Sequence, residues 1–223
     1  VVTSVENTGS EAHTLEMLSS FTLGSLSPFS EGLAPESLKI HRLRSTWSAE
    51  GRLVTENAED LQLEPSWKCY SANSVRFGSV GSFPVRGFVP FCAVEDTAHG
   101  VTWAAATTLG SSWQMELYRQ DFGLSLSGGL ADREFGAWCK TLAPGACFTA
   151  PKAVLTAVRG GVDTAAQVLA ENTRRAIEPL LPASEKPLPV LFNEFCSTWG
   201  KPTEETILKH LESLKGHNLG YYV

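Results

Sequence analysis

The sequence is short of positive charge and has no long apolar run. It contains 18 Lys and Arg residues and 24 Asp and Glu residues, which gives a formal net charge of −6 at pH 7. A nucleic-acid-binding surface needs clustered Lys and Arg, so this balance argues against a nucleic-acid partner. No apolar run approaches the ~20 residues of a membrane-spanning helix, and no basic amphipathic segment suits a membrane surface. We therefore expect neither nucleic acid nor a membrane as a partner.

Paired cysteine and histidine motifs are also lacking. The cysteines show no C-x-x-C spacing, which argues against a zinc site or a disulfide framework; they are Cys69, Cys92, Cys139, Cys147 and Cys196. We expect buried, reduced thiols, which lean toward a reducing, cytoplasmic compartment. The five histidines are dispersed with no second ligand at metal spacing, and neither a nucleophile elbow nor a phosphate loop occurs. No metal or cofactor is expected.

Short runs of alternating apolar and polar residues fill positions 1–158, separated by clusters of Gly, Pro, Ser and Asn. Residues 113–118 alternate in this way, as do positions 122–126, and the Ser-Gly-Gly run at 127–129 predicts a turn. Residues 135–141 predict a further strand. Aromatic residues on both faces of such strands are typical of one sheet packed on another. The pattern predicts a mainly β domain, a large antiparallel super-sandwich.

The periodicity changes to that of a helix after Gly160 and Gly161. Apolar residues recur on one helical stripe between positions 162 and 180, with Asp163 or Thr164 as the N-cap and prolines ending the helix. A proline-rich stretch follows. Residues 159–187 are therefore predicted to be a helix and a linker.

Residues 188–223 predict a strand, a helix and a second strand. Positions 190–192 are a short apolar run of the kind buried in parallel sheets. Thr203 can cap the helix and Gly216 can follow its end. A strand, a helix and a strand are the unit that begins a (β/α)8 barrel or a doubly wound sheet. Because the chain stops within its last strand, where backbone groups need partners, we expect a fragment of a longer protein.

The segment after the first of these strands holds the best candidate binding residues. Barrel active sites form at the C-terminal ends of the strands, so we expect Asn193, Phe195 and Trp199 at the mouth of a pocket. Aromatic rings can stack on the apolar face of a sugar, while an amide hydrogen-bonds its hydroxyl groups. The alternative, that both rings pack beneath the helix, stays open. Glu194 is a candidate for lining the pocket.

Five segments of the chain resemble segments of the family 36 glycoside hydrolases, the α-galactosidase (melibiase) family, and they occur in the same order as in that family. They are residues 47–50, residues 76–79 with 90–93, residues 142–154, residues 189–193, and residues 203–205 with 220–223. Residues 189–193 read Pro-Val-Leu-Phe-Asn, like the first barrel strand of that family. Residues 142–154 resemble its "L-x-P-G-E-x-F-x-T-P-E-A" stretch, which closes the sandwich domain.

This resemblance implies a retaining hydrolase of terminal α-linked galactose, or α-N-acetylgalactosamine, in oligosaccharides or glycans. Family members use two catalytic aspartates from later barrel strands, past Val223, so no catalytic residue is expected in this chain and the fragment is expected to be inactive. The Trp that borders the sugar in the family is Phe195 here, which keeps an aromatic face and loses the indole N–H.

Two other interpretations remain from the sequence. The sandwich can be a non-catalytic carbohydrate-binding module, or a structural module that supports contacts in a homo-oligomer. Trp47 is a candidate for a contribution of the sandwich to the sugar pocket, with packing in the core as the favoured alternative.

Overall fold

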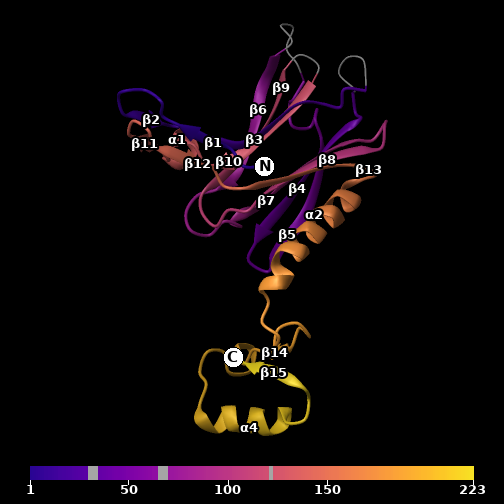
Figure 1. Cartoon of the computed structure of the whole chain (residues 1–223). Coiled ribbons are helices and arrows are strands. Elements are labelled where there is room, and N and C mark those ends of the chain that lie inside the picture. The colour runs from indigo at the N-terminus through magenta and orange to yellow at the C-terminus, as the bar shows by residue number, and fades with distance from the viewer. Residues whose placement is uncertain (30–34, 65–69, 121–122) are drawn as a thin grey trace. The chain divides into compact units, whose positions relative to one another are not determined.

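The computed structural model describes residues 1–29, 35–64, 70–120 and 123–223 (Figure 1). They form two compact units, Val1–Ala170 and Glu171–Val223. Two of the positions used above, Cys69 and Phe122, lie outside the described residues.

The larger sheet of the first unit has five antiparallel strands, in the order β13 (Ala153–Arg159), β8 (Val101–Thr107), β7 (Gly87–Asp96), β4 (Leu38–Thr46) and β5 (Ala49–Asn57). In its central strand, Cys92, Ala93 and Val94 are all fully buried. Successive strand residues point to opposite faces. Both faces of this sheet are therefore covered.

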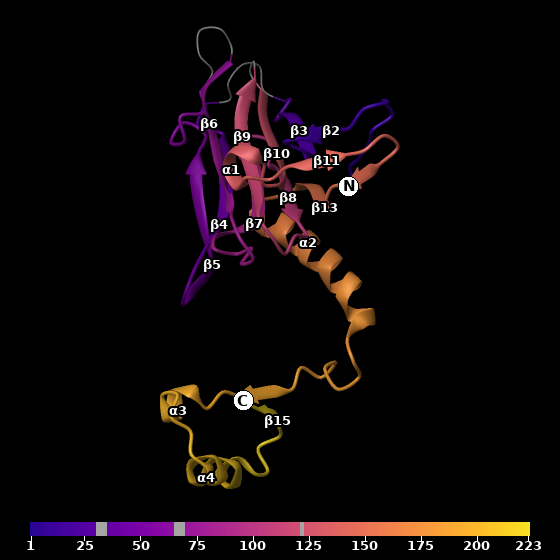
Figure 2. The ribbon, with the colours of Figure 1, turned by 90° about the vertical axis from the view of Figure 1, so that its left-hand side faces the viewer.

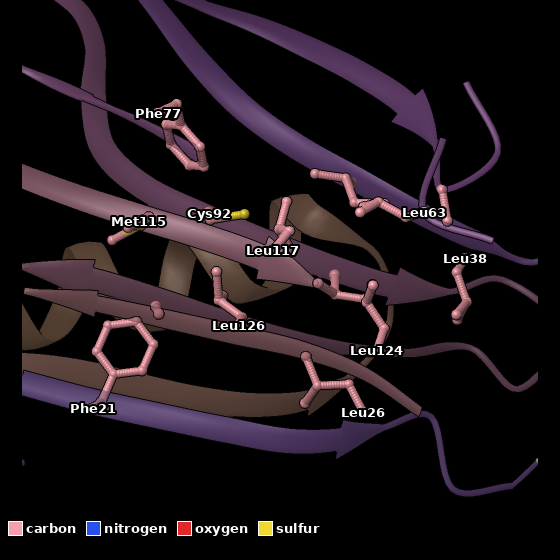
Figure 3. Close-up of a cluster of buried hydrophobic side chains, with 14 of the residues drawn as sticks. Phe21, Leu26, Leu38, Leu63, Phe77, Cys92, Met115, Leu117, Leu124 and Leu126 are labelled. Carbon is pink, nitrogen blue, oxygen red and sulfur yellow. The ribbon is translucent and has the colours of Figure 1, made fainter. Parts of the chain in front are cut away.

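One face packs against a four-stranded antiparallel sheet, in the order β3 (Ser19–Leu26), β10 (Gly123–Leu130), β9 (Trp113–Gln120) and β6 (Tyr70–Ser79). Met115 and Leu117 of β9 and Leu124 and Leu126 of β10 are fully buried between the sheets (Figure 3). Burying one such side chain contributes about 1.5–3 kcal/mol. The predicted antiparallel β-sandwich is confirmed.

The first turns of α2 (Val162–Ile177) pack on the other face of the larger sheet, against Phe91 and Ala93 of β7 and Ala104 of β8. The helix begins beside the sheet (Figure 2). Ala165 and Leu169 are its buried residues. Because the helix begins at Val162, Asp163 and Thr164 lie inside its first turn, and the prediction that one of them is the N-cap is wrong. The helix ends before the 3-10 turn η1 (Glu178–Leu180), as the prolines predict.

The predicted turn at residues 127–129 is wrong, because β10 continues to Leu130. Gly128 is needed for close packing, since a Cβ there would lie 2.8 Å from the Met115 side chain and 3.0 Å from the Phe21 ring. Gly129 has a φ of 154° and lies at an irregularity in the pairing of β10 with β3. The two glycines serve packing and a bulge within one strand.

The predicted strand over residues 135–141 is also wrong. The chain forms the short helix α1 (Arg133–Gly136), capped by Asp132, whose carboxylate accepts a 2.7 Å hydrogen bond from the Phe135 N–H. Only β11 (Lys140–Leu142) is extended, and it pairs with β2 (His13–Leu15). A second short pair joins β1 (Ser4–Glu6) to β12 (Cys147–Thr149).

The prediction of buried thiols holds for Cys92, where burial raises the pKa to about 12. It is wrong for three cysteines that are free and exposed: Cys139, Cys147 and Cys196. Cys147 lies in a two-stranded pair and Cys196 in a four-residue helix. Such short elements bury few side chains, which explains the exposure.

The second unit contains the predicted strand, helix and strand. β14 (Val190–Phe192) pairs with β15 (Leu219–Tyr222) in parallel, and α3 (Phe195–Thr198) and α4 (Glu204–Leu214) connect them (Figure 2). Thr203 caps α4 as predicted, since its hydroxyl accepts a 3.2 Å hydrogen bond from the Thr206 N–H. Gly216 has a φ of 86° and follows the end of α4, also as predicted.

Candidate functional site

The C-terminal ends of β14 and β15 lie side by side. The Glu194 N–H donates to the Val223 carbonyl at 2.9 Å, and the Val223 N–H donates to the Phe192 carbonyl at 2.9 Å. These bonds extend the parallel pairing beyond the last strand residues. Parallel strands bring their C-terminal ends to one edge, where ligands bind in α/β folds. Asn193 and Glu194 directly follow β14 and therefore lie at this edge of the strand pair.

Asn193 shapes the segment that follows this edge. Its side-chain oxygen accepts a 3.0 Å hydrogen bond from the Phe195 N–H, which satisfies a free donor at the start of α3. Asn193 is exposed and Glu194 is partly buried. The Glu194 carboxylate accepts a hydrogen bond from the Thr198 hydroxyl. The amide nitrogen of Asn193 remains a donor that a ligand can use.

Phe195 and Trp199 lie at the two ends of α3 and contact each other. Their ring centroids are 6.3 Å apart with an interplanar angle of 67°, an edge-on arrangement. Trp199 has a φ of 52° and ends the helix, and its backbone N–H donates a 2.7 Å hydrogen bond to the Phe195 carbonyl. Phe195 is 55% exposed and Trp199 is 74% exposed. The structure thus brings these two predicted residues into contact, and both rings remain accessible to solvent.

A second aromatic group joins β14, β15 and α4. Phe192 stacks on Tyr222 at 5.5 Å, and His210 of α4 hydrogen-bonds the Tyr222 hydroxyl through Nδ1 at 3.1 Å. Burial, followed by the negative charge of Glu194, raises the pKa of Tyr222 above its usual value of 10. Sequence reasoning missed Tyr222 and His210, because their contact depends on the strand register and on the rotation of α4. No local pattern signals this contact.

Trp47 lies in the first unit, in the turn between β4 and β5, and is 92% exposed. The favoured alternative for this residue, packing in the core, is therefore wrong. A hairpin tip projects beyond the sheet that would otherwise bury it, which explains the exposure. Trp47 borders a surface pocket of about 560 Å³ together with Phe83 and Arg86.

The described residues show no metal-binding group. Within residues 1–29, 35–64, 70–120 and 123–223, no three His, Cys, Asp or Glu side chains gather as ligands. In the same part of the chain, no helix has the length and apolar character needed to cross a membrane.

Neither a protein-family model nor a curated protein sequence matches the chain, but solved α-galactosidase structures share its fold. The α-galactosidase from Lactobacillus brevis is 18% identical, with a TM-score of 0.74, over 98% of this chain and 27% of that chain. A variant of the family 36 α-galactosidase AgaA from Geobacillus stearothermophilus, in complex with stachyose, is 16% identical, with a TM-score of 0.75, over 98% and 28%. A second AgaA variant, in complex with raffinose, is 16% identical, with a TM-score of 0.73, over 95% and 27%.

The chain thus spans little more than a quarter of the length of the structures it matches. Its fold is that of the N-terminal portion of family 36 α-galactosidases.

Proposed function

We propose that the chain is the N-terminal part of a retaining α-galactosidase-like glycoside hydrolase. Its substrate is a terminal α-linked galactose, or α-N-acetylgalactosamine, of an oligosaccharide or glycan. The observation that carries the proposal is the coverage of the fold match, because α-galactosidase structures align with 98% of the chain, and so with both units. The stachyose and raffinose complexes of AgaA support a galactoside as the ligand class.

In this proposal, β14 and β15 are the first two strands of a (β/α)8 barrel, and the sugar binds at their C-terminal ends. The exposed ring of Phe195 stacks on the apolar face of the sugar, and Trp199 borders it edge-on. The amide nitrogen of Asn193 donates to a sugar hydroxyl. Trp47 is a further carbohydrate contact, on the sandwich.

The bond-breaking groups are assigned to the chain beyond Val223. A retaining hydrolase uses two carboxyl groups about 5–5.5 Å apart, one as nucleophile and one as acid and base. Glu194 is not assigned either role, since its carboxylate is bonded to the Thr198 hydroxyl beside the strand end. The 223-residue chain by itself is therefore expected to bind sugar without cleaving it.

The coding sequence beyond Val223 tests this proposal. We expect an Asp-rich motif directly after β15, followed by at least ~200 residues of alternating strands and helices. The full-length protein should release galactose from raffinose, while the 223-residue chain should release none. A stop codon directly after Val223, or a full-length protein that binds raffinose without hydrolysing it, would contradict the proposal.

A further inference from the structure

The tip of the β4–β5 hairpin forms one wall of a concave surface pocket. Thr46, Trp47 and Glu50 line it from the hairpin, and Phe83 and Arg86 line it from the segment before β7. Its volume of about 560 Å³ falls in the ~300–1,000 Å³ range of small-molecule sites. The concave shape and this volume suit a small ligand.

Two large apolar side chains of this pocket are left in water. Trp47 is 92% exposed and Phe83 is 63% exposed. The hairpin turn is held by Glu50, whose carboxylate accepts a 3.0 Å hydrogen bond from the Ser48 N–H. Because this hydrogen bond fixes the turn, the exposed Trp47 ring provides a surface on which a ligand ring can stack.

Three arginines lie in or near the pocket: Arg86 is part of its lining, while Arg44 and Arg52 lie on the strands beside it, outside the lining. Arg44 of β4 lies directly opposite Arg52 of β5, on the same face of the sheet, and Arg86 comes just before β7. Arg44 also lies 5.6 Å from the centroid of the Phe88 ring. In the part of the chain that the structure describes, no carboxylate lies within 4.0 Å of these three guanidinium groups.

Like charges directly opposite each other in a sheet are destabilising. An anion bound between them relieves the repulsion, and guanidinium groups bind carboxylate and sulfate oxygens in pairs. This concentration of positive charge stands out in a chain of net charge −6. The arginines therefore indicate an anionic ligand.

We propose that this pocket binds an anionic saccharide, one whose pyranose ring carries a carboxylate or a sulfate. Trp47 and Phe83 stack on the sugar ring, while Arg44, Arg52 and Arg86 bind the anionic group. Thr46, which precedes Trp47, lies two residues along β4 from Arg44, a span of about 6.8 Å in a regular strand. A saccharide that stacks on Trp47 can therefore extend toward the Arg44–Arg52 pair. The site lies in the first unit and specifies the ligand of the carbohydrate contact that the proposed function assigns to Trp47, while its binding can be measured apart from hydrolysis.

Calorimetric titration of the 223-residue chain tests the proposal with three ligands: an oligogalacturonate, a sulfated galacto-oligosaccharide and a neutral galacto-oligosaccharide. We expect at least one acidic ligand to bind at least about tenfold more tightly than the neutral one, and to bind more weakly as salt is raised. The two acidic ligands distinguish carboxylate from sulfate.

Two variants and one matched control locate the site. Trp47→Ala, and separately Arg44→Gln with Arg52→Gln, should each weaken acidic-saccharide binding about tenfold or more. Arg174→Gln with Arg175→Gln removes the same charge from α2 and should change the affinity less than about twofold. Saturation-transfer NMR on the unmodified chain reads ligand contact with aromatic protons, so the test does not depend on how a variant folds.

Three results would overturn the proposal: equal affinity for neutral and acidic saccharides, an equal loss in the α2 control, or no saccharide binding at all. If no saccharide binds and Trp47→Ala shifts a monomer–dimer equilibrium in sedimentation, the surface is instead a contact between two copies of the chain.

Discussion

Replacing Phe195 with alanine removes the aromatic face that we assign to sugar stacking, at little cost in stability. The side chain is 55% exposed, and its contact with Trp199 is edge-on at 6.3 Å. The hydrogen bond at the start of α3 survives the change, since Asn193 accepts from the backbone N–H of this residue. An exposed aromatic contact of this kind contributes about 0.5–1 kcal/mol to folding, so the protein should remain folded.

The effect on catalysis should be larger than the effect on folding. Stacking on a sugar ring, taken as about 1–1.5 kcal/mol by analogy with aromatic pairs, corresponds to a loss of roughly 5- to 12-fold in kcat/KM. Steady-state hydrolysis of raffinose by the full-length enzyme measures this loss. Because stacking acts on the bound sugar before and during the reaction, most of the loss should appear as a higher KM.

Matched variants separate stacking from a general loss of apolar surface. Phe195→Tyr keeps the ring and should stay within about twofold of the unmodified enzyme. Leu208→Ala removes an apolar side chain of α4 that is 57% exposed, and should leave the kinetics unchanged. Unchanged kinetics in Phe195→Ala, or an equal loss in Leu208→Ala, would refute the assignment.

Three further predictions concern the sandwich. Leu126→Ala should lower the free energy of unfolding in urea by about 2–5 kcal/mol, whereas Leu53→Ala, at a side chain that is 46% exposed, should cost less than about 1 kcal/mol. Burial lowers the pKa of His41 despite the opposing charge of Glu95. Because the unfolded chain binds this proton more tightly than the folded chain, the free energy of unfolding should fall as the pH falls from about 6.5 through the lowered pKa. His41→Gln should flatten this part of the stability profile. In a Cys69→Ser background, a thiol reagent should label the exposed cysteines of the folded chain and reach Cys92 only on unfolding.

Local sequence signals predicted several elements because those elements depend on neighbouring residues. The Thr203 cap and the glycine after α4 were readable from residues within a few positions of each helix end. Strand β9 and the first half of β10 followed from alternation, which reports burial on one face of a sheet. The prolines likewise marked the end of α2.

The errors arose where a local pattern has two physical explanations. Two adjacent glycines suit a turn, but at positions 128 and 129 they allow close packing and a bulge. Apolar alternation over residues 135–141 suggested a strand, although the capping residue Asp132 was a readable signal for the helix α1. The exposure of Trp47 and the Tyr222–His210 contact depend on tertiary placement, which no local pattern encodes.

The anomeric form of the sugar released by the full-length enzyme tests the central claim most directly. Proton NMR during hydrolysis of raffinose shows which anomer of galactose appears first, before mutarotation mixes the two. A retaining α-galactosidase should release α-galactose first. Initial release of β-galactose, or no release of galactose, would contradict the account.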